Sequence, residues 1–403
     1  MPKSKRDLTM EQQLGRGPVD LPFLMLVLLL VGIGTVMVFS ASFATAYYVE
    51  DDPFYYVKRH AVFVAAGLVI MYLISKFNYQ LWRGLSMPLL GAAFVLLVLV
   101  LTPLGCGSEE VGAQRWMKVF LVAGPGFQPS EIAKLAVILF FSARLAKRDG
   151  QKKRKWNRRT ALGRLLQVLD DIGFLELVPY AAILLAMAGL MLKEPHLSGT
   201  VLIMAGGAAV LFAAGVRLYW FIIGGGFAAA GLWFIITFTD YMSARIELWL
   251  DPWSDAQNKG YQTIQSIYAI ASGGLTGLGL GQSRQKYLYL PEPENDFIFS
   301  IAVEELGFIG AILIIALFAL LIIRGYWLAI HARDRFGSLV IVGINTLLAV
   351  QVFLNIGVVT NFLPNTGISL PFFSYGGTAL WIHMAEMGII LAVSRQIPAP
   401  KQE

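Results

Sequence analysis

Charged side chains are scarce in this 403-residue chain. Asp, Glu, Lys and Arg together make up 14% of the residues, whereas a soluble globular domain carries roughly 25%. Hydrophobic residues make up 57%, and several apolar stretches reach about 20 residues, which is enough to cross a hydrocarbon core as helix. The composition excludes an ordinary soluble domain and indicates an all-α polytopic membrane protein.

Other absences narrow the possible chemistry. Cys106 is the only cysteine, so no intrachain disulfide can form. The four histidines are scattered singly, which argues against a metal site with fixed ligand spacing. Neither a nucleotide-binding motif nor a Ser-His-Asp set is evident. The net charge of +6 does not indicate nucleic-acid binding, because the basic residues cluster between the apolar segments.

The apolar stretches predict ten spans. The first is longer than the core of about 7–15 residues typical of a signal peptide, so we interpret it as an uncleaved span. The Lys and Arg residues of the short loops all fall on one side of an alternating arrangement, which the positive-inside rule assigns to the cytoplasm. Both termini are therefore expected there. The predicted spans cover residues 21–48, 57–76, 82–103, 129–147, 173–192, 197–215, 218–239, 297–325, 338–361 and 376–394.

These spans divide the chain into a single membrane domain with two tails. We expect a cytoplasmic N-terminal tail at 1–20, a ten-span membrane domain at 21–394 and a cytoplasmic C-terminal tail at 395–403. The cytoplasmic loop 148–172 is strongly basic, and the stretch 144–164 holds ten Lys and Arg residues against one acid. Such a run either fixes the topology or binds anionic lipid or a partner; the simpler interpretation is a topology determinant.

The external loop 240–296 is long and is rich in aromatic residues, glycines and amides. The aromatic residues favour packing near the bilayer interface over disorder. The segment QTIQSIYAI predicts a short amphipathic helix that places Gln262 and Gln265 together. The run GGLTGLGLG either offers backbone N–H groups to phosphate or sugar oxygens or is simply a flexible glycine turn.

Polar residues at the start of the fourth span form a first candidate cluster. Pro129 opens a helix with Glu131 in its first turn, and Lys134 lies one turn deeper on an apolar segment. A charge at that depth usually faces a polar cavity or a partner. Residues three apart on a helix share one face, so Glu131 and Lys134 are expected to pair, either as a purely structural ion pair or as part of a site.

Three further clusters stand at the external ends of spans. Glu194 and His196 lie at the junction of the fifth and sixth spans, and His383 and Glu386 are spaced to hydrogen-bond inside the last span. The loop LPNTGISLPFFSYGGTAL (363–380) is uncharged and re-enters the membrane. Irregular backbone at that depth is tolerated only against protein or a water-filled cavity.

The segment YLPEPENDFIFS (289–300) places three carboxylates against the start of an apolar run. Asn295 or Asp296 could simply cap the following helix. The alternative is functional. Carboxylates, a few buried cations, amides and aromatic residues around an external cavity suit the handling of a polar head group attached to a lipid.

Four motifs give the chain a recognisable pattern. GAQRW…QPSEIAKL, GYQTIQS…ASGGLTGLGLG, YLPEPENDFIFSIAVEELGFIG and PNTGISLPFFSYGG occur in order along the chain. Together they resemble the SEDS family (shape, elongation, division and sporulation), which includes RodA, FtsW and SpoVE and has ten spans. The segments NTGISLPFFSYGGTAL and EPHLSGT are more similar to the FtsW/SpoVE branch than to RodA.

The resemblance implies a peptidoglycan glycosyltransferase, a transferase of cell-wall biogenesis. Such an enzyme polymerises lipid II into β-1,4 glycan strands on the outer face of the bacterial cytoplasmic membrane, during division or cell-wall growth. The implied partners are a class B penicillin-binding protein and other divisome or elongasome membrane proteins. The residues alone also allow two other classes of function: a lipid II flippase or transporter, and a non-enzymatic division scaffold.

The resemblance also assigns residues. Asp296 matches the catalytic aspartate of the L-P-E-x-x-x-D-F element, Arg115 matches the arginine of the first motif, and Lys58-Arg59 matches a basic element. That element normally ends in glutamine, which is His60 here. RodA-like members read Q-P-D-L-G-T where this chain has EPHLSGT, so the aspartate of that motif has no counterpart here.

The expected mechanism is a single displacement with Asp296 as general base. Cations would stabilise the leaving diphosphate, directly or through a divalent ion such as Mg²⁺ or Mn²⁺; the sequence itself specifies no cofactor and no metal ligands. The substrate-binding residues expected beside Asp296 are Arg59, Arg115, Glu131, Lys134, Gln262, Gln265, Ser374 and Tyr375.

Overall fold

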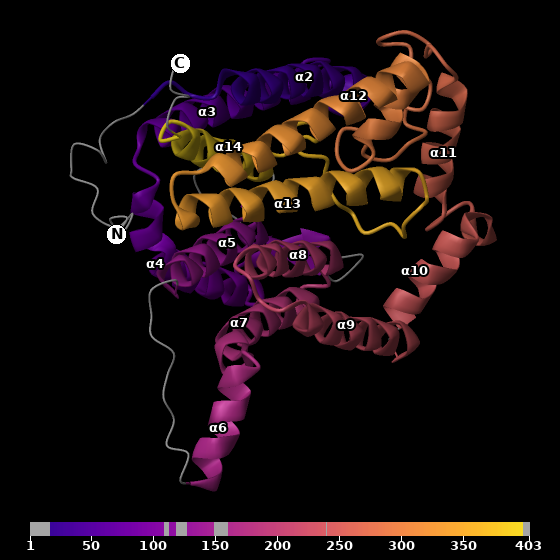
Figure 1. Cartoon of the computed structure of the whole chain (residues 1–403). Coiled ribbons are helices and arrows are strands. Elements are labelled where there is room, and N and C mark those ends of the chain that lie inside the picture. The colour runs from indigo at the N-terminus through magenta and orange to yellow at the C-terminus, as the bar shows by residue number, and fades with distance from the viewer. Residues whose placement is uncertain (1–16, 109–112, 118–126, 149–159, 239, 398–403) are drawn as a thin grey trace.

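The structure is a computed structural model, and it describes residues 17–108, 113–117, 127–148, 160–238 and 240–397. These residues form a bundle of mostly long helices (Figure 1), together with one small two-stranded hairpin. The elements are α2 (Leu21–Val49), α3 (Tyr55–Lys76), α4 (Gln80–Val100), β1 (Gly105–Ser108), β2 (Ala113–Met117), α5 (Pro129–Arg148), α6 (Ala161–Asp171), α7 (Phe174–Lys193), α8 (Leu197–Ala213), α9 (Leu218–Phe238), α10 (Asp240–Leu250), η1 (Pro252–Asp255), α11 (Tyr261–Gly273), α12 (Ile298–His331), α13 (Arg335–Val359) and α14 (Gly377–Ser394).

A helix occupies each of the ten predicted spans. Within the described ranges, seven helices are long and apolar enough to cross a membrane, namely α2, α3, α4, α7, α12, α13 and α14. α8 and the Leu218–Gly231 stretch of α9 are apolar but shorter. α5 carries charged residues yet is almost wholly buried among other helices, where a span need not be apolar. The chain is thus a polytopic helical membrane protein.

The turns of the bundle separate into two ends. The backbone N–H of Gly17 donates to the carbonyl of Arg395 at 2.8 Å, and the Tyr79 hydroxyl donates to Asp334 Oδ1 at 2.6 Å. These contacts bring the start and end of the described chain to the same end as the α3–α4 and α12–α13 turns, at the left of Figure 1. This arrangement agrees with an even number of membrane crossings. That this end of the bundle lies in the cytoplasm stays a prediction.

The segment 240–296, predicted to be external, is folded at the opposite end of the bundle. It contains α10, η1 and α11, and α11 packs against α12 (Figure 1). The helix predicted from QTIQSIYAI is therefore present. This long segment is built from helices and caps that end of the bundle.

The glycine run after α11 packs into a break in α12. Gly307 interrupts α12 with φ 70° and ψ −173°. The N–H groups of Leu278 and Gly279 donate to the carbonyls of Glu304 and Glu305, both at 3.0 Å. A Cβ on Gly277 would lie 2.2 Å from the Glu305 carbonyl oxygen, so only glycine fits this contact. The N–H groups of Leu278 and Gly279 are therefore not available to phosphate or sugar oxygens, because α12 already uses them.

A buried network fixes the same loop to the helices. The Lys286 ammonium pairs with Glu305 at 3.0 Å, and the Ser40 hydroxyl of α2 donates to the same carboxylate at 2.6 Å. Glu304 accepts from the backbone N–H of Arg284 at 3.0 Å. Buried charges need such complete pairing, and here the pairing attaches the segment that leads to Asp296 to the bundle.

Candidate active site

A cavity of about 670 Å³ lies at the end of the bundle that is capped by the segment 240–296. This volume is in the usual range of about 300–1,000 Å³ for ligand pockets. Its walls come from α2, α3, β2, α5, α8, α10, α13, α14 and two loops, 292–296 and 367–376. The polar and charged lining residues include Tyr56, Arg115, Glu131, Lys134, His196, Ser198, Arg245, Glu292, Glu294, Asp296, Gln351, Ser369, Ser374, Tyr375 and His383.

Asp296 enters this cavity from the residue before the N-cap of α12. The N-cap is Phe297, and no side chain caps the helix. The amide of Asn295 instead donates to Glu292 Oε2 at 3.1 Å. The capping interpretation is therefore wrong for both Asn295 and Asp296. Among the described residues, none donates a hydrogen bond to the Asp296 carboxylate, so its oxygens are available to a ligand.

The main chain of Asp296 is held by Asn355, a fully buried residue of α13. The Asn355 amide donates to the carbonyl of Asp296 at 2.8 Å and to that of Ile368 at 2.7 Å. One side chain therefore joins the start of α12 to the neighbouring loop 363–376. In the sequence, Asn355 is marked only as a polar residue within an apolar span, and it was not predicted as a site residue.

We expect Asn355→Ala to lower any activity that depends on Asp296 by about 10²-fold in the folded protein, the typical cost of displacing a reacting group by about 1 Å. Asn345→Ala is the matched control, since Asn345 is equally buried on the same helix and donates to the carbonyl of Ile322 at 2.8 Å. Both variants lose a buried amide, which destabilises a protein by about 1–3 kcal/mol. Equal rates for the two variants, measured per folded molecule, would show that Asn355 does not position Asp296.

Burial sets the electrostatics of the acidic loop. It raises the pKa of Asp296 to about 6, with a further rise from Glu292 and an opposing effect from Arg115. It also raises the pKa of Glu294 to about 7. A carboxylate in water loses its proton near pH 4. Asp296 is therefore a stronger base than an exposed aspartate and is still largely ionised at neutral pH.

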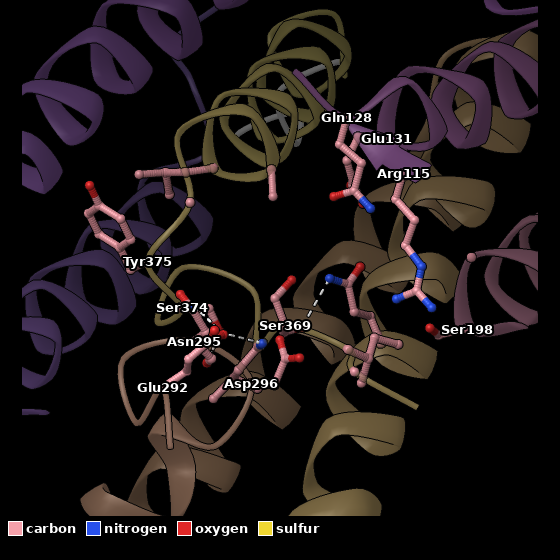
Figure 2. Close-up of a pocket in the computed structure, with 18 of the residues that line it drawn as sticks. Arg115, Gln128, Glu131, Ser198, Glu292, Asn295, Asp296, Ser369, Ser374 and Tyr375 are labelled. Atoms are coloured by element: carbon pink, nitrogen blue, oxygen red, sulfur yellow. Dashed lines mark hydrogen bonds between the residues drawn. The ribbon is translucent and has the colours of Figure 1, made fainter. Parts of the chain in front are cut away.

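Arg115 faces Asp296 from the hairpin. β1 and β2 pair antiparallel, with Cys106 opposite Trp116, and Figure 2 shows Arg115 and Asp296 approaching the same space from different elements. A Cβ added to Gly367 would lie 3.3 Å from Asp296 Oδ2 and 4.0 Å from Arg115 Nη1. The guanidinium of Arg115 also donates to the carbonyl of Pro195. Sequence analysis identified the arginine but did not predict the hairpin that positions it.

The turn between α7 and α8 lies directly behind Arg115. Glu194 is buried there, and burial raises the pKa of its carboxyl to about 8 against the effect of Arg115. Burial, with Arg115 and Lys134 adding to it, lowers the pKa of His196 to about 3. Both side chains are therefore neutral at neutral pH, so the cationic charge of Arg115 is not cancelled by this turn.

The floor of the cavity contains the two predicted intrahelical pairs. Lys134 Nζ lies 2.8 Å from Glu131 Oε1, and His383 Nδ1 lies 3.0 Å from Glu386 Oε2. Both predictions of pairing are confirmed. Because Glu131, Lys134 and His383 also line the cavity, their polar groups face the space a ligand would occupy.

The loop 363–376 contributes the wall beside Asp296. The Ser374 hydroxyl donates to the carbonyl of Asn295 at 2.8 Å and accepts from the N–H of Leu370 at 2.7 Å. Ser374 therefore lies in the wall with its hydroxyl engaged by the backbone. Tyr375 lies at the edge of the cavity (Figure 2) and packs against Tyr56, with the ring centroids 5.2 Å apart.

Three predicted binding residues lie outside this lining. Arg59 stacks over the ring of Tyr55, with 4.1 Å from its guanidinium carbon to the ring centroid. The Gln262 amide donates to the carbonyl of Pro291 at 3.3 Å, and Gln265 lies half-buried on the same helix. None of the three is among the residues that line the cavity, so their contacts with substrate stay predictions.

Arg245 is a further cationic residue of the cavity that sequence analysis missed. It belongs to α10, and its Nη1 donates to the carbonyl of Asn365 at 2.8 Å. Its sequence context, RIELWLDPW, resembles an ordinary helix surface. Arg245 reaches the site only because the segment 240–296 folds over the bundle.

The described part of the chain offers few metal ligands close together. Over the described ranges, no group of three or more His, Cys, Asp or Glu side chains is placed to hold a metal ion. The acidic residues of the cavity are spread over its mouth and floor. The residues present therefore do not form a site for a resident metal ion.

Comparison with known proteins identifies the family of the chain. Residues 21–398 match the family model FTSW_RODA_SPOVE, described as "Cell cycle protein". The chain is 42% identical over 377 residues to stage V sporulation protein E of Bacillus subtilis, covering 93% of this chain and 97% of that protein. It is 39% identical over 378 residues to a probable peptidoglycan glycosyltransferase FtsW of Trichlorobacter lovleyi, covering 93% of each.

Solved structures agree with this family assignment. One is described as "Structural coordination of polymerization and crosslinking by a peptidoglycan synthase complex"; a chain in it matches with a TM-score of 0.72 at 28% identity, over 96% of this chain and 99% of that one. RodA of Thermus thermophilus matches with a TM-score of 0.64 at 25% identity, over 95% and 98% of the two chains. The chain therefore belongs to the FtsW/RodA/SpoVE family, as its four motifs indicated.

Proposed function

We propose that this protein is a peptidoglycan glycosyltransferase that joins lipid II disaccharide units into β-1,4 glycan strands at the outer face of the bacterial cytoplasmic membrane. The observation that carries the proposal is that a half-buried carboxylate, Asp296, and a guanidinium, Arg115, line the same cavity. The relatives named as peptidoglycan glycosyltransferases support the reaction class.

The proposed reaction is one displacement at an anomeric carbon. The 4-hydroxyl oxygen of the acceptor sugar forms a bond to that carbon, and the bond from the carbon to the diphosphate oxygen breaks. Undecaprenyl diphosphate leaves with the electron pair, and the hydroxyl proton moves to Asp296. The α-linked donor gives a β-linked product, which a single in-line displacement explains.

The charges around the cavity suit the two halves of this step. Asp296 has a pKa near 6, which makes it an effective proton acceptor at neutral pH. The leaving diphosphate develops negative charge that fixed cations stabilise, and Arg115 and Arg245 both line the cavity. Lys134 is a weaker candidate for this role, because Glu131 already neutralises it.

The remaining predicted contacts extend the site beyond the cavity. The Arg59 side chain lies beside Tyr375, and we propose that it meets a diphosphate at the rim of the cavity. Gln262 and Gln265 lie on α11 behind the acidic loop and would meet sugars only further along the outer surface. A class B penicillin-binding protein is the proposed partner, supported by the likeness to a chain of a polymerising and crosslinking complex.

The decisive experiment is polymerisation of lipid II by the purified full-length protein in detergent or nanodiscs, with and without a co-purified class B penicillin-binding protein. Gel analysis of labelled products should show long glycan strands in at least the second condition. Movement of lipid II across vesicles without any strands would instead favour a flippase. Full complementation of a deletion strain by Asp296→Ala would favour a scaffold.

A further inference from the structure

The short helix α6 stands apart from the bundle. It lies in the cytoplasmic loop 148–172, and its main protein contact is with α7. In Figure 1 it projects at the bottom and runs across the direction of α9 and α13. A helix that crosses the direction of the spans at one end of a membrane bundle runs along the membrane surface rather than through it.

α6 has two chemically different faces. Leu165 and Val168 are 56% and 57% exposed. On the other side, the Gln167 amide donates to Asp171 Oδ1 at 3.1 Å. The sequence places apolar residues at 162, 165, 166 and 169, the spacing of one helix face. An 11-residue helix is marginal in water, so this apolar face needs an apolar partner.

The base of α6 carries an aromatic anchor. Gly173 turns the chain with φ 78° between α6 and α7. The Trp220 indole N–H donates to the carbonyl of Ile172 at 3.0 Å, and the Tyr219 hydroxyl donates to the same carbonyl. Phe174 packs on Trp220, with ring centroids 5.4 Å apart. Trp and Tyr residues with a polar group turned to backbone are typical of the membrane–water interface, which places the base of α6 at that depth.

The charge of the neighbouring sequence selects the kind of lipid. The segment KKRKWNRR, residues 152–159, carries six Lys and Arg residues and no acid; it lies outside the described residues and contributes here only its charge. Basic segments beside a span attract the anionic lipids of the cytoplasmic leaflet. A soluble protein partner would have to match this charge and the apolar face together, whereas an anionic bilayer surface supplies both.

We propose that α6 is a surface helix that docks on the anionic leaflet of the membrane, with the side of Leu165 and Val168 in the boundary between head groups and acyl chains. Gln167 and Asp171 then face water. The inference concerns the end of the bundle opposite the cavity and does not depend on the reaction at Asp296.

The test uses full-length protein in nanodiscs, in a Cys106→Ser background, with one cysteine placed by Val168→Cys, Leu165→Cys or Gln167→Cys and labelled with an environment-sensitive fluorophore. In phosphatidylglycerol-containing nanodiscs we expect labels at 165 and 168 to shift to the blue. Lipid-borne quenchers should quench them about threefold more than the label at 167. Phosphatidylcholine alone should weaken this difference.

Two outcomes would overturn the proposal. One is equal emission and equal quenching at 165, 167 and 168 in anionic nanodiscs. The other is shielding of 165 and 168 that is the same with and without phosphatidylglycerol, since that would remove the anionic leaflet as the partner. Thermal unfolding of each labelled protein, compared with the unlabelled protein, checks that the chain is folded with a label at each of the three positions.

Discussion

Asp296→Asn is expected to lower the rate of lipid II polymerisation by about 10²–10⁴-fold, the usual contribution of a positioned general base. Asparagine has nearly the same shape as aspartate, and the bond from Asn355 is made to the main-chain carbonyl of residue 296. The substitution therefore removes the proton acceptor and leaves its position unchanged. The measurement is the initial rate of strand formation from labelled lipid II, with the proposed transpeptidase partner present.

Glu294→Gln is the matched control for this prediction. Glu294 lies two residues away, is 4% exposed and has one carboxylate oxygen without a partner in the described structure. Burial also raises its pKa, to about 7, so it is the best rival base in the cavity. We expect Glu294→Gln to retain most of the activity. If Glu294→Gln loses activity while Asp296→Asn keeps it, the proton acceptor is Glu294.

Gly367→Ala is expected to give the second large loss of activity. Gly367 has φ 63°, and an added Cβ would stand 3.3 Å from Asp296 Oδ2 and 4.0 Å from Arg115 Nη1. The methyl group would occupy the gap in which a sugar hydroxyl has to reach the base. Displacing reacting groups by about 1 Å costs about 10²-fold in rate, and we expect a loss of that order in the same polymerisation assay.

The backbone strain of this substitution needs its own control. Gly215 also has a left-handed φ, 87°, but nothing lies within 4 Å of an added Cβ. Gly215→Ala therefore introduces the strain without the obstruction. We expect it to lower thermal stability about as much as Gly367→Ala and to polymerise at nearly the wild-type rate. Similar rates for the two variants would show that the gap beside Gly367 is not used.

Much of the fold could be predicted because spans and helix faces are local properties. A helix occupies each of the ten spans predicted from the apolar runs, and seven helices of the described residues are long and apolar enough to cross a membrane. The spacing of three residues predicted the Glu131–Lys134 and His383–Glu386 pairs, both of which form. These features depend on residues close in sequence, so periodicity and hydropathy are enough to find them.

The parts that could not be predicted depend on contacts between distant segments. Arg245 reaches the cavity only because α10 folds over the bundle, and Asn355 is 59 residues from the carbonyl it holds. The glycine run is a further example, because the sequence alone left it open between a cradle for phosphate or sugar oxygens and a flexible turn. Its composition shows that its N–H groups can be approached closely, whereas the structure shows that Glu304 and Glu305 of α12 accept from it.

The central claim, that Asp296 removes the hydroxyl proton, is tested most directly by the pH dependence of the polymerisation rate. The base must be ionised, so the rate should fall as the pH drops through about 6, the pKa of Asp296. Glu292 raises that pKa through its negative charge. Removing the charge with Glu292→Gln should therefore lower the pKa and move the acidic limb to lower pH. An acidic limb that is absent, or that stays in place in Glu292→Gln, would contradict the assignment of Asp296 as the base.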